Sequence, residues 1–262
     1  MIVTLKRITG NLGFIILSAL LITSCNKNSI TDPPVPKDTG YFPNGDGSRY
    51  IYSVVNTDSE GNLSVGTRST EYSGISVKNG NTYQVQTDSI NIAGAVDISL
   101  SYFRKTNDTL YYFLDTTGLS SLIPDSLKNN IAWDREMKIL SFPVTENKSW
   151  SVFRVSVIYL IFNIPVLTVE SSYDGTEAVT LNLNSGDVTE NAVKLKYTMT
   201  LSIPNTLSTS TFTAYSWLVE GIGIVKWQGN ATILSAFTGG GVNLSDTTSV
   251  ITQSLISYDV KQ

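Results

Sequence analysis

The sequence contains no histidine and only one cysteine among its 262 residues. The lack of histidine removes the commonest general base, a common metal ligand and every Ser-His or Cys-His nucleophile pair. A single cysteine excludes an internal disulfide. Lysine and arginine number 18 against 22 acidic residues and form no run, so the basic surface typical of nucleic-acid-binding proteins is missing. We therefore predict a protein that is not an enzyme, holds no cofactor or metal, and binds no nucleic acid.

The single cysteine, Cys25, closes an apolar stretch near the N-terminus. The stretch runs from Leu12 to Ile22, after the basic residues Lys6 and Arg7. This is the layout of a secretory signal, and the run is too short for a membrane span, which needs about 20 apolar residues. The segment Leu21–Cys25 resembles the lipobox of bacterial lipoproteins, in which the cysteine is acylated and becomes the first residue of the mature chain. We predict a signal peptide over residues 1–24 and lipid attachment, with palmitate-type acyl chains, at Cys25.

A polar, proline-rich segment follows Cys25 and reaches to Gly40. Its composition predicts an extended tether with little to bury. Asn26 follows the cysteine, so the aspartate that retains enteric lipoproteins in the inner membrane is absent by resemblance. We expect residues 25–40 to be an acylated cysteine and tether that anchor the protein to the outer membrane, with the leaflet left open.

Alternation of apolar and polar residues dominates residues 41–262. The segments 194–201 and 254–260 both have this period of two, which is typical of half-buried strands. Turn signals rich in asparagine, aspartate and glycine separate the strand-like segments, as at Tyr173–Gly175. The pattern predicts a single all-β domain, mainly antiparallel, with at most one or two short helices. Helical spacing of leucines over 118–130 predicts one of them.

The stretch from Val155 to Val169 is apolar on both faces of any strand it forms. One interpretation is a strand buried between the sheet and a covering element, or a hairpin that turns at Asn163 and Pro165. The other is the lining of an apolar cavity or a membrane-facing patch. In that second interpretation the cavity wall consists of Val157, Tyr159, Ile161, Ile164 and Leu167.

Two motifs carry a further resemblance. Tyr41-Phe42-Pro43 is followed by Gly47 and Tyr50-Ile51-Tyr52, and Trp217–Lys226 has the form aromatic-x-x-x-Gly-x-Gly-x-x-Lys. Both resemble a group of Bacteroidetes-type lipoproteins that is similar in pattern to the periplasmic lipid-handling proteins LolA and LppX. The resemblance implies a strongly curved sheet, as a half-barrel or sandwich, around an apolar cavity, and a structural role for Gly221 and Gly223.

Other candidate sites have weaker signals. The segment Asn56–Gly61 has the oxygen spacing of a calcium loop, but Thr67 stands where the closing glutamate belongs, so a solvated hairpin loop is expected. The carboxylate pairs Glu170 with Glu177, and Asp134 with Glu136, have the residue types of a glycosidase, and sequence alone does not place either pair across a cleft.

These observations predict an outer-membrane lipoprotein that binds a lipid or another hydrophobic ligand. The alternative is an interaction module that binds an envelope protein or a glycan and has a solid core. A buried cavity lined by the 155–169 stretch would favour the first function, and exposed clusters of tyrosine and tryptophan on a flat face would favour the second. In both cases the N-terminal lipid is the contact with the membrane.

Overall fold

The structure is a computed structural model that describes residues 40–114, 130–203, 208–237 and 247–261. The predicted signal peptide, Cys25, the predicted tether up to residue 39 and residues 118–129 of the predicted helix lie outside the described residues.

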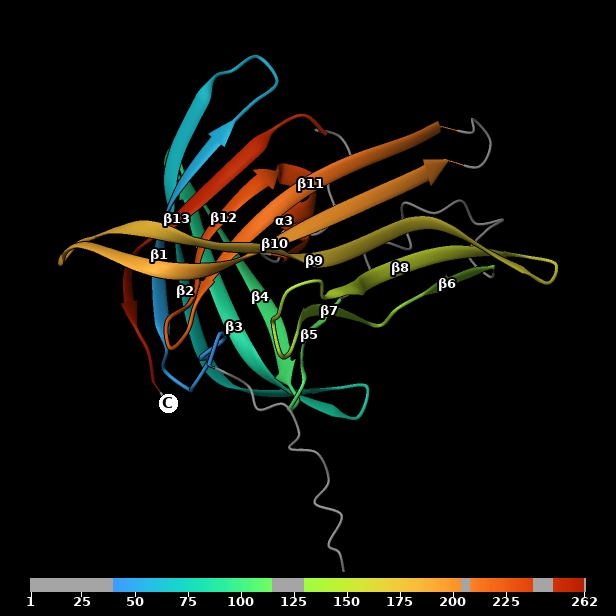
Figure 1. The fold of residues 1–262 in the computed structure, drawn as a ribbon, viewed down its shortest axis with the longest axis horizontal. Coiled ribbons are helices and arrows are strands. Elements are labelled where there is room, and N and C mark those ends of the chain that lie inside the picture. The colour runs from blue at the N-terminus through green and yellow to red at the C-terminus, as the bar shows by residue number, and fades with distance from the viewer. Residues whose placement is uncertain (1–39, 115–129, 204–207, 238–246, 262) are drawn as a thin grey trace, which may run out of the picture. The chain divides into compact units, whose positions relative to one another are not determined.

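One antiparallel sheet contains 13 strands (Figure 1). The first seven are β1 (Arg49–Thr57), β2 (Leu63–Lys78), β3 (Asn81–Ile92), β4 (Ala95–Lys105), β5 (Thr109–Phe113), β6 (Ile131–Trp133) and β7 (Glu136–Ser141). The other six are β8 (Ser149–Tyr159), β9 (Phe162–Leu183), β10 (Gly186–Ile203), β11 (Ser208–Val219), β12 (Gly223–Asn230) and β13 (Val250–Asp259). Their order across the sheet is β6-β8-β9-β10-β11-β12-β13-β1-β2-β3-β4-β5-β7. The predicted all-β, antiparallel architecture is confirmed.

The sheet curves until its two ends meet. Trp150 Nε1 on β8 donates a hydrogen bond to the carbonyl of Lys138 on β7 at 2.9 Å, and the Tyr197 hydroxyl on β10 reaches the carbonyl of Ile139 at 3.3 Å. No backbone ladder joins β7 to β8 within the described strands, so the sheet stays open along this line. The predicted strong curvature is confirmed, and we call the line where β7 meets β8 the seam.

Alternation along the strands separates an inner face from an outer face. On β10 the side chains of Leu195, Tyr197 and Met199 are buried, whereas Lys196 and Thr198 between them are partly exposed. Because side chains on a strand point alternately to opposite faces, one apolar set can fill the hollow of the curved sheet. This inner face forms the hydrophobic core.

A short helix, α3 (Ala231–Phe237), packs against the core directly after β12. The Asn230 side chain accepts a hydrogen bond from the Thr232 amide at 3.0 Å, as an N-cap does. Ile233, Leu234 and Phe237 are buried. The helix was not predicted from sequence. Within the described residues no helix is both long and apolar enough to cross a membrane.

The far half of the β9–β10 hairpin lies over the outer face of the sheet. Its strands cross in front of β1 and β13 (Figure 1), and the Asn184 amide donates to the carbonyl of Ile256 at 2.8 Å. The predicted turn at Tyr173–Gly175 is wrong, because β9 continues through it. Gly175 has a φ of +109° beside a shift in the β9–β10 register, so it forms a β-bulge that bends the strand.

Trp217 fastens this hairpin to the outer face. Its ring lies between the ammonium groups of Lys194, at 5.3 Å, and Lys226, at 4.5 Å. Its Nε1 donates to the carboxylate of Glu177 on the overlying strand β9. The adjoining Gly221 and Gly223, with φ of +78° and +104°, form the β11–β12 turn, so the structural role predicted for both glycines is confirmed.

Candidate functional site

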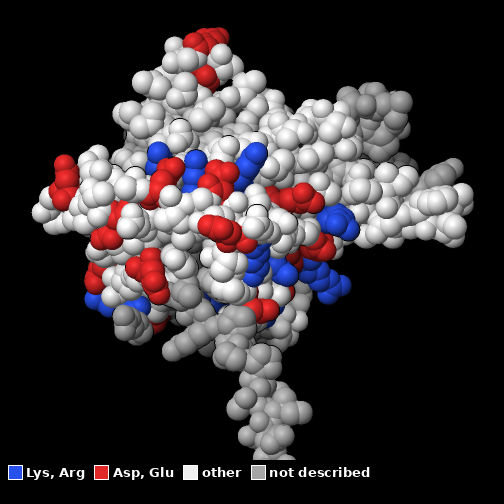
Figure 2. All heavy atoms as spheres, viewed as in Figure 1, with Lys and Arg blue, Asp and Glu red and all other residues white. Residues whose placement is uncertain are grey.

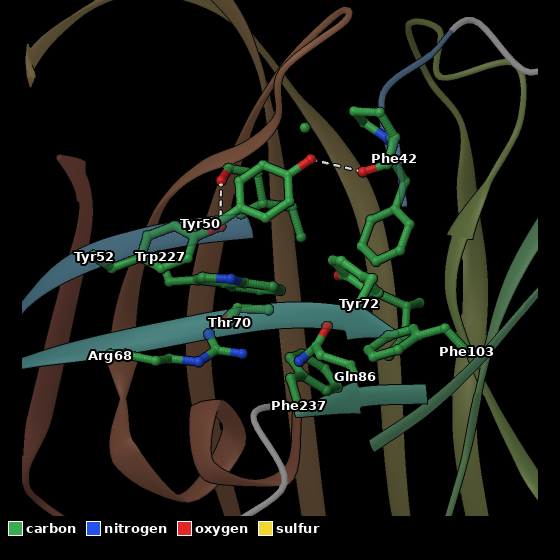
Figure 3. Close-up of a pocket in the computed structure, with 14 residues that line it drawn as sticks. Phe42, Tyr50, Tyr52, Arg68, Thr70, Tyr72, Gln86, Phe103, Trp227 and Phe237 are labelled. Carbon is green, nitrogen blue, oxygen red and sulfur yellow. Dashed lines mark hydrogen bonds between the residues drawn. The ribbon is translucent and has the colours of Figure 1, made fainter. Parts of the chain in front are cut away.

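The inner face encloses a small pocket walled mainly by aromatic rings (Figure 3). Its volume is about 40 Å³. The rings that line it belong to Phe42, Tyr50, Tyr52, Tyr72, Phe103, Trp227 and Phe237. The polar residues Arg68, Thr70 and Gln86 form one side of it.

A buried ion pair lies behind the polar side of the pocket. Arg68 Nε donates to Asp88 Oδ1 at 2.8 Å, and the two side chains are 6% and 0% exposed. The Asp88 carboxylate also accepts hydrogen bonds from Thr70 Oγ1 at 2.6 Å and from Gln86 Nε2. Arg68 Nη1 donates to Gln253 Oε1 at 2.9 Å. Every polar partner of this pair therefore comes from β2, β3 or β13.

Electrostatics keep the Arg68 guanidinium charged and the neighbouring phenols neutral. Burial alone would lower the pKa of Arg68, but the adjacent Asp88 carboxylate outweighs it and raises that pKa. Burial raises the pKa of Tyr52, and the positive charge of Arg68 only partly opposes this. The neutral Tyr52 hydroxyl donates to the carbonyl of Ile224 at 2.9 Å, and the Tyr50 hydroxyl donates to the carbonyl of Pro43 at 2.6 Å. Both phenol hydroxyl protons are therefore used in hydrogen bonds within the protein.

The size of the pocket limits what it can hold. A cavity of about 40 Å³ has room for a few water molecules. Pockets for small organic ligands are typically about 300–1,000 Å³, and a lipid needs at least that. The inner face is thus filled by its own side chains.

The structure places the predicted cavity-wall residues on the β8–β9 hairpin. Val157 lies opposite Ile164 in the ladder, and Leu167 lies opposite Val155 on the same face. Leu167 is 9% exposed at the base of the hairpin, Ile164 is 40% exposed, and Ile161 is 91% exposed in the turn. Tyr159 ends β8. The hairpin therefore brings Val157, Ile164 and Leu167 together, but none of the five residues lines the interior pocket.

The hairpin interpretation of the 155–169 stretch is correct in kind and wrong in the position of its turn. The chain reverses at Leu160 and Ile161, where Leu160 has a φ of +56°, and Pro165 lies inside β9 next to a shift in the ladder. Proline tolerates such a bulge because no amide is needed there. Leu160, Ile161 and Phe162 are exposed by 79%, 91% and 60% and form an apolar tip.

A larger hollow lies outside, at the seam. This seam groove has a volume of about 490 Å³. Its lining residues come from β5, β7, β8 and the link between β6 and β7, and they are Tyr111, Asp134, Arg135, Glu136, Lys138, Ser151, Val152 and Arg154. In Figure 2 basic and acidic side chains lie close together over β7 and β8.

Glu136 is the most constrained charge of the seam groove. Its carboxylate accepts from Arg104 Nε at 3.0 Å, from Arg104 Nη2 at 2.8 Å and from the Tyr83 hydroxyl at 2.6 Å. Burial disfavours its ionisation, but the bonds from Arg104 and Tyr83 outweigh burial and lower the pKa of Glu136. An ionised carboxylate is a poor proton donor at neutral pH.

The substitution Glu136→Gln tests this arrangement. A carboxyl whose folded pKa lies below its unfolded value of about 4.5 stabilises the fold above that pH, and the contribution is lost as the pH falls through the folded pKa. We expect the melting temperature at pH 7 to fall by about 2–4 °C, for a partly exposed pair of about 1 kcal/mol. The difference from wild type should shrink in melts below about pH 4.5. Glu170→Gln, on the exposed side of β9, is the matched control, and a difference that does not change with pH would contradict the prediction.

The segment considered as a calcium loop forms the connection between β1 and β2. Asp58 accepts hydrogen bonds from the backbone amides of Glu60 and Asn62 and from the Asn62 side chain, so its oxygens are used by the loop itself. These bonds lower the pKa of Asp58, with the Asn62 side chain as the largest cause. Across the described ranges no group of three His, Cys, Asp or Glu side chains converges as a metal site.

Comparison with known proteins gives a general likeness of fold. No family model matches the sequence, and no curated protein matches it. The chain is similar to a crystal structure of a candidate lipoprotein from Parabacteroides distasonis, with a TM-score of 0.43 and 14% identity. It is also similar to a candidate exported protein with a YmcC-like fold from Bacteroides fragilis, with a TM-score of 0.44 and 15% identity. Each alignment covers 84% of this chain and 98% of the other.

Proposed function

We propose that this chain is a lipid-anchored protein of the bacterial outer membrane whose β domain is a non-catalytic binding module. The observation that carries the proposal is the contrast between a filled interior of about 40 Å³ and an outer seam groove of about 490 Å³. A ligand larger than a few waters fits the outside of the sheet and not its hollow. Residues 25–40 supply the anchor, because a lipobox ends at Cys25 and a polar tether follows it.

The engagement of the acidic side chains supports a non-catalytic role. Glu136 is held ionised by Arg104 and Tyr83, and Glu177 accepts a hydrogen bond from Trp217. Two carboxylates that share a reaction need opposed pKa values, with one raised so that it can donate a proton. Glu136 has a lowered pKa, so it does not suit the role of the proton donor.

A second candidate function is the binding of a lipid or another hydrophobic ligand, and the β8–β9 hairpin favours it. Leu160, Ile161 and Phe162 expose apolar surface at its tip, and Ile164 continues that surface toward the core. Exposed apolar patches of this kind commonly contact membranes or apolar partners. In this alternative the ligand lies against the hairpin.

Mass spectrometry of the full chain, extracted from bacterial membranes in mild detergent, tests both candidates. We expect a polypeptide that begins at Cys25 and carries its acyl chains, with no lipid bound non-covalently at one per protein. The variant Cys25→Ser should lack the mass of the acyl chains and should no longer be attached to the membrane through them. Stoichiometric lipid in the organic extract would overturn the filled-interior argument and favour the second candidate. An unacylated Cys25 would overturn the anchor.

A further inference from the structure

The seam groove gathers several basic side chains in its lining. Arg135, Lys138 and Arg154 line it, and within the described part of the chain none of the three forms an ion pair. Lys148 lies close to this cluster: burial lowers its pKa, Asp108 opposes the change, and the positive charge of Lys138 adds to it. Cations held together without partners attract an anion, and guanidinium groups bind carboxylates through paired hydrogen bonds.

The same groove carries acceptors that a simple anion would not need. Asp134 Oδ2 accepts from the backbone amide of Arg154 at 2.9 Å, which places this carboxylate beside the basic cluster. Glu136 and Ser151 add further oxygens to the lining. Carboxylates repel phosphate or sulfate but accept hydrogen bonds from hydroxyl groups. The lining therefore suits a ligand that has negative charges and hydroxyl donors in one molecule.

An aromatic ring completes the wall. Tyr111 lines the groove, and the Arg104 guanidinium lies over its ring at 4.3 Å. Because Glu136 holds Arg104 through two hydrogen bonds, the tyrosine ring is fixed in place. A preorganised ring gives an apolar contact at little cost in side-chain entropy, and the C–H faces of a sugar suit it.

We propose that the seam groove binds an acidic oligosaccharide, whose carboxylates contact Lys138, Arg135 and Arg154 and whose hydroxyls contact Asp134 and Glu136. The volume of about 490 Å³ suits a segment of a few sugar units. This inference rests on the proposed binding-module function and names its ligand class.

Titration calorimetry of the full acylated protein in detergent tests the inference with α-1,4-linked trigalacturonic acid as the probe. We expect saturable binding that weakens as sodium chloride rises, because part of the attraction is between charges. The double variant Lys138→Gln/Arg154→Gln should weaken binding at least tenfold. Both side chains are exposed or partly exposed, so its melting temperature should stay near that of wild type. Lys196→Gln, a basic residue of β10 outside the groove, makes the same kind of charge change and should leave the affinity within about twofold.

Three results would overturn the acidic-sugar assignment. They are equal binding of neutral maltotriose, no effect of the double variant, and failure of the trigalacturonate to bind. Binding of a glutamate-rich peptide in place of the sugar would also overturn it and assign the groove to an acidic protein segment. None of these results contradicts the proposal that the domain is a binding module. That proposal fails separately if mass spectrometry finds stoichiometric lipid bound to the protein.

Discussion

Replacing Asp88 with leucine is expected to lower the free energy of unfolding by about 3–5 kcal/mol, because Arg68 would be left as an unpaired charge inside the core. The two side chains are 0% and 6% exposed, so bulk solvent does not reach the charge that is left behind. For a domain of this size the melting temperature should fall by about 6–20 °C. Thermal and urea unfolding measure the change.

A double-mutant cycle separates the ion pair from its neighbours. Arg68→Met alone should also destabilise, but Arg68→Met/Asp88→Leu should lose less than the sum of the single losses, since neither variant side chain is charged. The matched control is Glu71→Gln, which removes one charge from the exposed pair with Arg49 and should barely move the melting temperature. Strictly additive losses would mean that Asp88 acts through Thr70 and Gln86 and not through Arg68.

Gly229→Ala is expected to cost about 3 kcal/mol or more, because the added Cβ would meet backbone that cannot move aside. It would lie 2.6 Å from the carbonyl oxygen of Thr213 and closer still to the Ala214 backbone on the neighbouring strand. Gly229 also has a φ of +149°, in the region that favours glycine. Denaturant unfolding should give a lower midpoint.

Substitutions at two other glycines separate the two causes of this destabilisation, which are the positive φ and the close approach of the neighbouring backbone. Gly61 has a φ of +86° with open space around it, so Gly61→Ala measures the backbone term alone, about 1–2 kcal/mol. A Cβ on Gly66 would overlap the Asn91 carbonyl, so Gly66→Ala measures close approach. A Gly229→Ala variant no less stable than Gly61→Ala would contradict the close-packing argument.

The fold class was predictable because alternation alone determines which side chains face the core. Leu195, Tyr197 and Met199 are buried at the spacing that the sequence displays. Turn positions were less predictable, since a bulge and a turn can both require a residue with positive φ, which favours glycine. Gly175 and Pro165 have typical turn chemistry, yet both lie inside β9, where a shifted register accommodates them.

Most of the candidate site could not be predicted from the sequence. Arg68 and Asp88 lie 20 residues apart, and only the β2–β3 register, in which Thr70 faces Asp88, brings the three together. The seam groove depends on curvature, because β5 and β8 are far apart in strand order and meet only when the sheet bends. One signal in the sequence could have pointed to the buried Arg68–Asp88 network. Arg68 is a charged residue at a position of β2 where the apolar–polar alternation expects an inward-facing apolar side chain.

The pairing of β1 with β13 sets an order of events for a newly made chain. Arg49 lies opposite Asp259, so the middle of the sheet joins the first strand to the last. Such a distant contact forms slowly, because the chain loses the entropy of closing a long loop before the strand pairing can stabilise it. β1 and β2 can form a hairpin as soon as they are made. Tyr50 and Tyr52 on β1, however, gain their neighbours on the other side only when β13 pairs with β1. Truncation before Val250, which removes β13, should therefore leave β1 unpaired on one edge, and a ribosome or translocon must release β13 before the core can close.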